Sequence, residues 1–235
     1  MNTKPGFATK DSLNEHLWNA RDAFNTAAPA EVVEMIEAGA TKIESMDIVS
    51  KALREGDEFP DVALLNQNGE MRLLKDYLAK GPLIVTMYRG QWCPYCNLQL
   101  ATYREHLSEF ASRGATLVAV SPEKPDADTS IDLPPTVAIE MIDKHELPFD
   151  VLFDEGNVLA KQLGIVFTFP EEHQQVLQRF DVVVEEANGD NSYAFPDPAT
   201  YVLSKDGIIR WAFLPNNYRK RAEVSDIVAA LERLS

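Results

Sequence analysis

The chain has 235 residues, of which 45% are hydrophobic and 25% are charged, and its formal net charge is −15. A chain of this length can bury a full α/β core, so we expect one domain with an appendage. The acidic balance argues against a nucleic acid or an anionic membrane as a partner, because phosphates need a basic footprint. The longest apolar stretches have the length of strands, and we therefore expect no membrane span.

The cysteine content indicates a reducing compartment. Only two cysteines occur, and both belong to one CxxC motif, so they cannot form a disulfide framework. The N-terminal stretch MNTKPGFATKDS has no apolar core and does not look like a secretory signal. We therefore expect a cytoplasmic protein with a redox role.

The first 53 residues are predicted to form an N-terminal helical extension, and residues 54–235 the main domain. Helix is expected from residue 11 to about 53, with Asp11 as a plausible N-cap and Pro29 at the start of a second segment. Apolar residues recur at helical spacing in the first segment: Leu13, Leu17, Ala20 and Phe24. No chemistry is apparent here, so we expect these helices to pack on the main domain or across a homodimer.

The main domain is predicted to alternate strands and helices. In order, the pattern predicts a β-hairpin over 62–74, a short helix over 75–79, a buried strand over 83–88, a helix to about 113 and a strand over 115–120. It then predicts a helix over 136–145, a strand over 149–153, a helix over 156–163, a helix over 171–180 followed by a loop, a hairpin over 200–214 and a helix over 222–234. This order indicates an α/β fold with a mixed sheet and helices on both faces.

The CxxC motif lies where the central strand meets a helix. After the apolar run 83–88 the sequence RGQ turns the chain, and Trp92-Cys93-Pro94-Tyr95-Cys96 opens a helix in which Pro94 suits the first turn. Backbone N–H groups and the positive end of the helix dipole favour a thiolate there. Two sulfurs at this spacing lie within bridging distance, which indicates a thiol–disulfide active site.

A zinc site and inert buried cysteines are the alternatives. Zinc prefers four ligands, but no second cysteine pair exists, and the four histidines, His16, His106, His145 and His173, have no ligand-like spacing. Inert cysteines are disfavoured because the helix junction would activate them. We expect no metal.

Further site candidates surround the motif. Pro198 precedes a predicted strand, where it is either a cis-proline that exposes backbone groups to a partner chain or a proline at an ordinary strand start. Arg89 is either a fixed cation beside the thiols or a member of a surface ion pair. Trp92 and Tyr95 either shape a contact surface for substrate or partner, or simply pack.

These residues resemble a known family. The stretch YRGQWCPYCN at 88–97 is similar to the peroxiredoxin-like branch of the alkyl hydroperoxide reductase/thiol-specific antioxidant family, which has the thioredoxin fold. Further agreement lies in GDEFP at 56–60, VSP at 120–122, PAT at 198–200, Asp206-Gly207, and Asn217-Tyr218-Arg219 with Arg221. The resemblance covers about residue 56 to the C-terminus and implies a peroxiredoxin-type mixed sheet flanked by helices, with an N-terminal extension.

The resemblance implies a thiol peroxidase. Cys96 falls at the position of the peroxidatic cysteine, Cys93 is the resolving candidate, and thioredoxin or a similar dithiol would reduce their disulfide without a metal or organic cofactor. The sequence departs from the family pattern at three positions. Cys93 stands where the family keeps a threonine, Arg89 where it keeps a proline, and Pro198 where it keeps its catalytic arginine. Arg89 is a candidate substitute for that arginine.

Three functions stay open at this point. The first is a peroxidase that consumes hydrogen peroxide or organic hydroperoxides. The second is a protein-disulfide oxidoreductase in which Cys93 attacks, as the sequence CPYC also suggests. The third is a redox-sensing protein whose N-terminal helices bind a partner.

Overall fold

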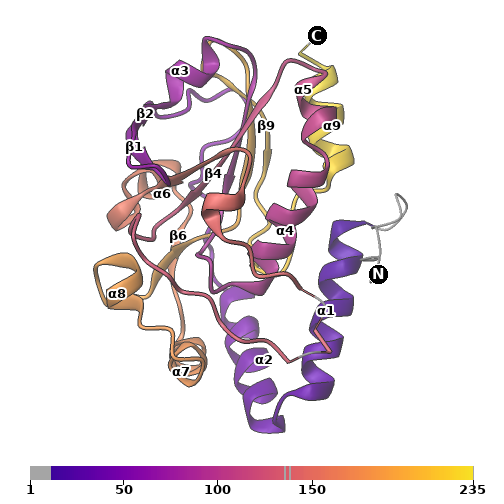
Figure 1. Cartoon of the computed structure of the whole chain (residues 1–235), viewed down its shortest axis with the longest axis vertical. Coiled ribbons are helices and arrows are strands. Elements are labelled where there is room, and N and C mark those ends of the chain that lie inside the picture. Colours follow the sequence, from indigo (N-terminus) through magenta and orange to yellow (C-terminus); the bar gives the residue numbers. More distant parts are fainter. Residues whose placement is uncertain (1–11, 135, 138, 235) are drawn as a thin grey trace.

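A seven-stranded mixed sheet forms the centre of the molecule (Figure 1). The structure is a computed structural model that describes residues 12–134, 136–137 and 139–234. The strand order is β2 (Met71–Leu73), β1 (Ala63–Asn66), β5 (Asp150–Phe153), β4 (Thr116–Ser121), β3 (Leu83–Met87), β8 (Thr200–Leu203) and β9 (Ile209–Phe213). Strands β3, β4 and β5 run parallel, whereas the neighbours at both sides pair antiparallel, so the predicted mixed sheet is confirmed.

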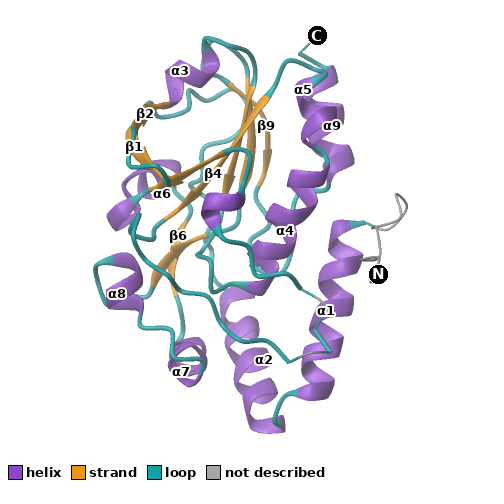
Figure 2. Ribbon diagram, viewed as in Figure 1, coloured by secondary structure: helices purple, strands orange, loops and turns teal. Residues whose placement is uncertain are grey.

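Helices cover both faces of this sheet (Figure 2). One side carries α4 (Pro94–Glu105), α5 (Leu107–Ala111) and α9 (Val224–Glu232), and the other carries α3 (Leu74–Leu78) and α6 (Val158–Leu163). All five residues of β3 are buried, with Ile84 in the core under α4 and its neighbours Leu83 and Val85 in the opposite core. An unbroken apolar run is therefore required, because alternate side chains enter different cores.

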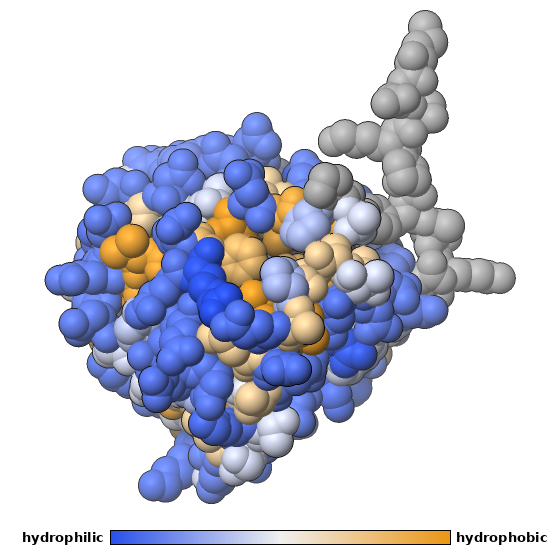
Figure 3. All heavy atoms as spheres, turned by 90° about the horizontal axis from the view of Figure 1, so that it is seen from below, coloured by the Kyte–Doolittle hydropathy of each residue, from blue (hydrophilic) through white to orange (hydrophobic). Residues whose placement is uncertain are grey.

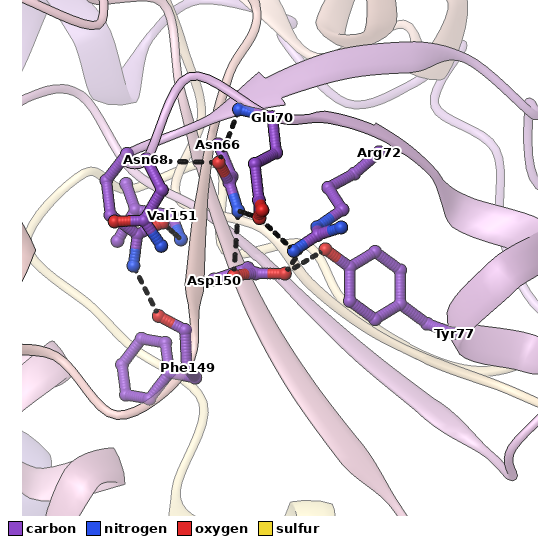
Figure 4. Close-up of polar contacts among 9 residues, drawn as sticks. Asn66, Asn68, Glu70, Arg72, Tyr77, Phe149, Asp150 and Val151 are labelled. Atoms are coloured by element: carbon purple, nitrogen blue, oxygen red, sulfur yellow. Dashed lines mark hydrogen bonds and ion pairs between the residues drawn. The ribbon is translucent and has the colours of Figure 1, made fainter.

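Asp150 joins the first hairpin to the parallel strands (Figure 4). Its carboxylate accepts hydrogen bonds from Asn66 Nδ2 (3.2 Å), Arg72 Nε (3.3 Å) and the Tyr77 hydroxyl. Asn66 also closes the hairpin turn, since its Oδ1 accepts the backbone N–H groups of residues 68 and 70. The hairpin predicted over 62–74 is thus present and is bonded to the end of β5.

The N-terminal extension consists of two helices at one end of the molecule, α1 (Leu13–Ala27) and α2 (Ala30–Glu44) (Figure 1). Ser12 caps α1, with its side chain accepting the Glu15 N–H, whereas Asp11 lies outside the described residues. The Glu223 carboxylate, just before α9, accepts the N–H groups of Leu13 (2.8 Å) and Asn14 (3.0 Å). The start of α1 is therefore bonded to the C-terminal part of the chain.

Helix α2 packs on α7 (Glu171–Arg179) through a close contact at Gly39. A Cβ atom at Gly39 would lie 1.9 Å from His173 Nδ1, so only glycine allows this approach. Helix α2 ends at Glu44, and the prediction of helix to about residue 53 is wrong. The reason is tertiary: Asn216 accepts the Ile48 N–H (3.0 Å) and donates to the Met46 carbonyl (2.9 Å), which replaces helical bonds.

Two further predictions fail in the middle of the chain. The helix expected over 136–145 is absent from its described residues, apart from the start of a 3₁₀ turn at Lys144–Glu146. The Ile142 N–H instead donates to Asn97 Oδ1 of α4 (2.8 Å). The loop expected after residue 180 contains α8 (Val184–Asn188) and β7 (Ala194–Pro196), which pairs with β6 (Val166–Thr168) in a small second sheet. Among the helices that the structure describes, none is long and apolar enough to cross a membrane.

Candidate active site

Cys93 and Cys96 lie at the start of α4, directly after β3 and its following turn. Cys93 is the N-cap residue, and its Sγ accepts the backbone N–H of Cys96 at 3.3 Å. Pro94 occupies the first turn, where a missing N–H costs no helical bond. Both cysteines are free thiols and both are completely buried.

Each sulfur receives a hydrogen bond from a different buried arginine. Arg89 Nη2 lies 3.0 Å from Cys93 Sγ, and Arg221 Nη2 lies 3.2 Å from Cys96 Sγ. The side chain of Arg89 is 3% exposed and that of Arg221 is completely buried. Arginine keeps its charge when buried, so two fixed cations adjoin the pair of thiols.

The surroundings of the two thiols shift their pKa values in opposite directions. Burial disfavours a thiolate there, but the hydrogen bond from Cys93 and the charges of Arg221 and Arg89 outweigh this, so the pKa of Cys96 lies well below its usual value. Burial and the same hydrogen bond raise the pKa of the Cys93 thiol. These two directions favour a thiolate at Cys96 and a protonated thiol at Cys93, which makes Cys96 the candidate nucleophile.

A buried polar network fixes Arg221. Its Nε donates to Gln99 Oε1 (2.7 Å), and its Nη1 donates to the carbonyls of Tyr218 and Lys220 (2.7 Å each). Gln99 in turn donates to Thr86 Oγ1 of β3 (2.8 Å). The guanidinium is thereby held against Cys96 by groups from α4, β3 and the segment before α9.

Sequence reasoning assigned no role to Arg221. The residue stands among the positions that carry the family resemblance, next to Asn217-Tyr218-Arg219, and that was its only signal. Arg89, in contrast, was named as a candidate cation beside the thiols, and the structure places its guanidinium in hydrogen-bond contact with Cys93 Sγ.

Arg89 is enclosed by aromatic rings. Its guanidinium carbon lies 4.6 Å from the ring centre of Tyr218 and 5.4 Å from those of Trp92 and Phe169. Such contacts stabilise a cation that has been removed from water. Trp92 is thus buried beside the cysteines, whereas Tyr95 is half-buried and packs edge-on against Tyr218.

The peptide bond before Pro198 is trans, whereas one interpretation of the sequence required a cis-proline there. No peptide bond in the described part of the chain is cis, so the reading of Pro198 as a cis-proline is wrong. Pro198 is buried in the short segment just before β8, which is an ordinary position for a proline ahead of a strand.

Glu123 is a buried acid that sequence reasoning missed. Its carboxylate accepts the Gln91 N–H (2.9 Å) from the turn before Cys93, and also the Thr129 hydroxyl. Burial raises its pKa to about 7. Glu123 therefore connects the loop after β4 to the active-site turn.

An apolar pocket adjoins this site between the N-terminal helices and α7, and we call it the helical pocket. It has a volume of about 120 Å³. Its walls come from α1, α2, α7 and the loop after β4, and its floor from the residues around the cysteines. The lining residues include Phe24, Ile36, Arg89, Trp92, Tyr95, His173, Val176 and Tyr218. The extension, to which the sequence assigned no chemistry, thus forms one side of a cavity next to the CxxC motif.

His173 makes the stability of the fold depend on pH. Its Nε2 lies 2.9 Å from the Tyr218 hydroxyl, and burial followed by the charges of Arg89 and Arg219 lowers its pKa to about 3. An unfolded histidine titrates near pH ~6.5, so below that pH the unfolded state binds the extra proton. We expect the free energy of unfolding to fall by about 2 kcal/mol between pH ~7 and ~5 through this residue, as measured by urea denaturation.

The matched variants are His173→Gln and, as a control, His145→Gln, in which an exposed histidine changes. His173→Gln should flatten the pH dependence of the free energy of unfolding, and His145→Gln should keep it. An equal slope in all three proteins would contradict the assignment.

No cluster of three or more His, Cys, Asp or Glu side chains able to hold a metal occurs in the ranges that the structure describes.

A sequence profile of the AhpC/TSA family matches residues 55–212. Among proteins similar in sequence, chloroplastic peroxiredoxin Q of Triticum aestivum is 21% identical over 207 residues, which are 88% of this chain and 80% of that protein. Chloroplastic peroxiredoxin Q of Oryza sativa subsp. japonica is 23% identical over 215 residues, or 92% and 81% of the two chains.

Solved structures show the same fold. Peroxidoxin BcpB from Mycobacterium tuberculosis gives a TM-score of 0.57 at 18% identity, over 78% of this chain and 99% of that one. Peroxiredoxin Q from Xanthomonas campestris gives 0.52 at 18% identity, over 76% and 97%. The predicted thioredoxin-like, peroxiredoxin-type fold is thereby confirmed.

Proposed function

The chain belongs to the AhpC/TSA family, and from this premise we propose that it is a thiol-dependent peroxidase that cycles through a Cys93–Cys96 disulfide. The observation that carries the proposal is the buried sulfur of Cys96 at the start of α4, which accepts a hydrogen bond from Arg221 Nη2 at 3.2 Å. A positioned, charged sulfur beside two cations suits attack on a peroxide bond, because the leaving oxygen develops negative charge.

In the first step the Cys96 thiolate attacks one peroxide oxygen. The S–O bond forms while the O–O bond breaks, and the released alkoxide or hydroxide takes up a proton to become an alcohol or water. The sulfur is oxidised to a sulfenic acid and the peroxide is reduced. The positive charges of Arg89 and Arg221 stabilise the negative charge that develops on the departing oxygen.

In the second step Cys93 resolves the sulfenic acid. Its sulfur attacks Cys96 Sγ, the S–S bond forms, and the hydroxyl leaves as water with the proton of the Cys93 thiol. The raised pKa of Cys93 keeps that proton available. Thioredoxin or a similar dithiol then reduces the disulfide by thiol exchange, for which a reducing cytoplasm is the natural setting.

The raised pKa of Cys93 favours this cycle over direct attack by Cys93 on a partner's disulfide. A protein-disulfide reductase that begins at Cys93 would need a thiolate on that residue, whereas the peroxidase cycle begins at Cys96.

The test is an assay on the wild-type chain, coupled to NADPH, thioredoxin reductase and thioredoxin. We expect catalytic consumption of hydroperoxide, and we expect one equivalent of peroxide to convert both free thiols to a disulfide, as seen by thiol titration and intact mass. Reduction of insulin disulfides without peroxide consumption would favour a disulfide reductase. The absence of both activities would favour a redox-sensing role.

A further inference from the structure

The two arginines beside the CxxC motif, Arg89 and Arg221, form no ion pair with a carboxylate within the described ranges. Apart from the Cys96 sulfur, the acceptors that Arg221 has in these ranges are neutral: Gln99 Oε1 and two backbone carbonyls. Arg89 donates to Cys93 Sγ, and its Nε is buried without a hydrogen-bond partner among the same residues. The cysteine sulfurs are therefore the bonded groups that can bring a negative charge to these two cations.

Asp197 is a buried acid that interacts with both arginines without bonding to either. Burial raises the pKa of Asp197 to about 6, although the charges of Arg221 and Arg89 act in the opposite direction. Its Oδ2 accepts the Asn216 N–H (3.2 Å), and its Oδ1 has no hydrogen-bond partner in the part of the chain that the structure describes. Asp197 therefore does not replace a counter-charge in direct contact.

The surroundings of the arginines screen charge weakly. Arg89 is enclosed by the rings of Tyr218, Trp92 and Phe169, and it lines the apolar helical pocket. Figure 3 shows hydrophobic side chains gathered at the end of the molecule where α1, α2 and α7 lie, within a border of hydrophilic ones. In such an environment, the loss of an anionic partner is more unfavourable than at an exposed position.

Formation of a Cys93–Cys96 disulfide removes the charge that the arginines face. A thiolate on Cys96 lies against Arg221 in the reduced chain, whereas both sulfurs of a disulfide are uncharged. Removing one partner of a buried ion pair is strongly unfavourable, because the other charge stays buried. The oxidised state therefore has an energetic penalty that the reduced state lacks, and a stabilised reduced state makes a disulfide a stronger oxidant.

We propose that Arg89 and Arg221 make the Cys93–Cys96 disulfide strongly oxidising, because its formation leaves two buried cations without a charged partner. The reduced dithiol is then the more stable state of the folded chain, and the disulfide is readily reduced by an external thiol. This inference rests on the dithiol–disulfide cycle of the proposed function, but it concerns the equilibrium of the pair and not its reaction with peroxide.

The first test compares the stability of the full wild-type chain in its two redox states. Diamide forms the disulfide, dithiothreitol keeps the thiols reduced, and urea denaturation gives the midpoint of each form. We expect the oxidised chain to unfold at a lower urea concentration than the reduced chain. This is the reverse of the usual effect of a disulfide, which constrains the unfolded state. An oxidised midpoint equal to or above the reduced one would overturn the inference.

The second test equilibrates the chain with mixtures of reduced and oxidised glutathione. One glutathione disulfide takes two electrons and two protons from the cysteines and becomes two thiols, and intact mass after alkylation gives the oxidised fraction. Arg221→Met should raise the equilibrium constant for disulfide formation by at least about tenfold, since a nearby opposite charge changes an ionisation equilibrium by about 10- to 10³-fold. A tenfold change lowers the reduction potential by about 30 mV.

The matched variants are Arg221→Lys, which keeps the charge and should change the constant less, and Arg210→Met, which removes a partly exposed arginine and should not change it. An Arg221→Met chain with the wild-type constant would overturn the inference and leave the peroxidase function intact. The urea comparison uses the wild type alone, so it decides the question if Arg221→Met does not fold. A chain in which diamide forms no Cys93–Cys96 disulfide would contradict both the inference and the proposed cycle.

Discussion

Replacing Cys96 by serine is expected to abolish peroxide consumption, with a fall of at least about 10³-fold in the thioredoxin-coupled rate. The reason is that Cys96 carries the negative charge of the thiol pair and contacts Arg221, whereas a serine hydroxyl at the same place is a far weaker nucleophile. The measurement is the initial rate of peroxide loss with hydrogen peroxide and with cumene hydroperoxide.

Cys93→Ser is the matched variant and should behave differently. It should react with one equivalent of peroxide and then stop, because the sulfenic acid on Cys96 lacks its resolving thiol. A dimedone-type reagent should then add to Cys96, as located by peptide mass spectrometry. If the adduct instead forms on Cys93 in the Cys96→Ser variant, and Cys93→Ser is inert, the roles of the two cysteines are reversed.

Replacing Arg221 by methionine is expected to slow the oxidation of Cys96 by about 10²- to 10³-fold, which is the usual effect of removing a charge-stabilising donor. The guanidinium lies 3.2 Å from Cys96 Sγ and lowers the pKa of that thiol, so the variant should also shift the pH dependence of oxidation to higher pH. Stopped-flow measurement of the rate against pH gives both quantities. Arg221→Lys keeps the charge and should recover part of the rate.

The control for Arg221 is Arg210→Met, which removes a partly exposed arginine of β9 that is paired with Asp206 of the preceding turn. It should leave the rate and the pH profile unchanged. Because Arg221 is fully buried, its loss also weakens the fold, and urea denaturation measures that separately. An Arg221→Met variant that is folded and has the wild-type pH profile would show that Arg221 acts only in the structure.

The parts of the fold that local pattern determines were predictable. The buried strand over the apolar run and the helix that begins at the cysteines were predicted from the order of residues in this stretch, and the structure has both as β3 and α4. Long-range contacts were not predictable. The Ile142 N–H donates to Asn97 Oδ1 instead of to a helical carbonyl. Arg221 donates to the sulfur of Cys96, which lies 125 residues earlier in the chain, and no local sequence pattern predicts such a contact.

The candidate site also has a part that the sequence predicted and a part that it did not. Arg89 lies four residues from Cys93, so its proximity to the thiols was open to prediction. The helical pocket was not, because its walls combine an amphipathic extension with α7 and a loop, each of which reads as ordinary core packing by itself. Pro198 shows the opposite error, since a motif-based analogy suggested a geometry that the backbone does not have.

The hydrogen bonds between α1 and the C-terminal segment have a consequence for Arg221. Asn14 Oδ1 accepts the backbone N–H of Arg221 (2.9 Å), and Asn14 Nδ2 donates to the Arg221 carbonyl (2.8 Å), so one side chain of α1 clamps both sides of that residue's backbone. The N-terminal extension therefore helps to position the backbone of the residue whose guanidinium contacts the Cys96 sulfur.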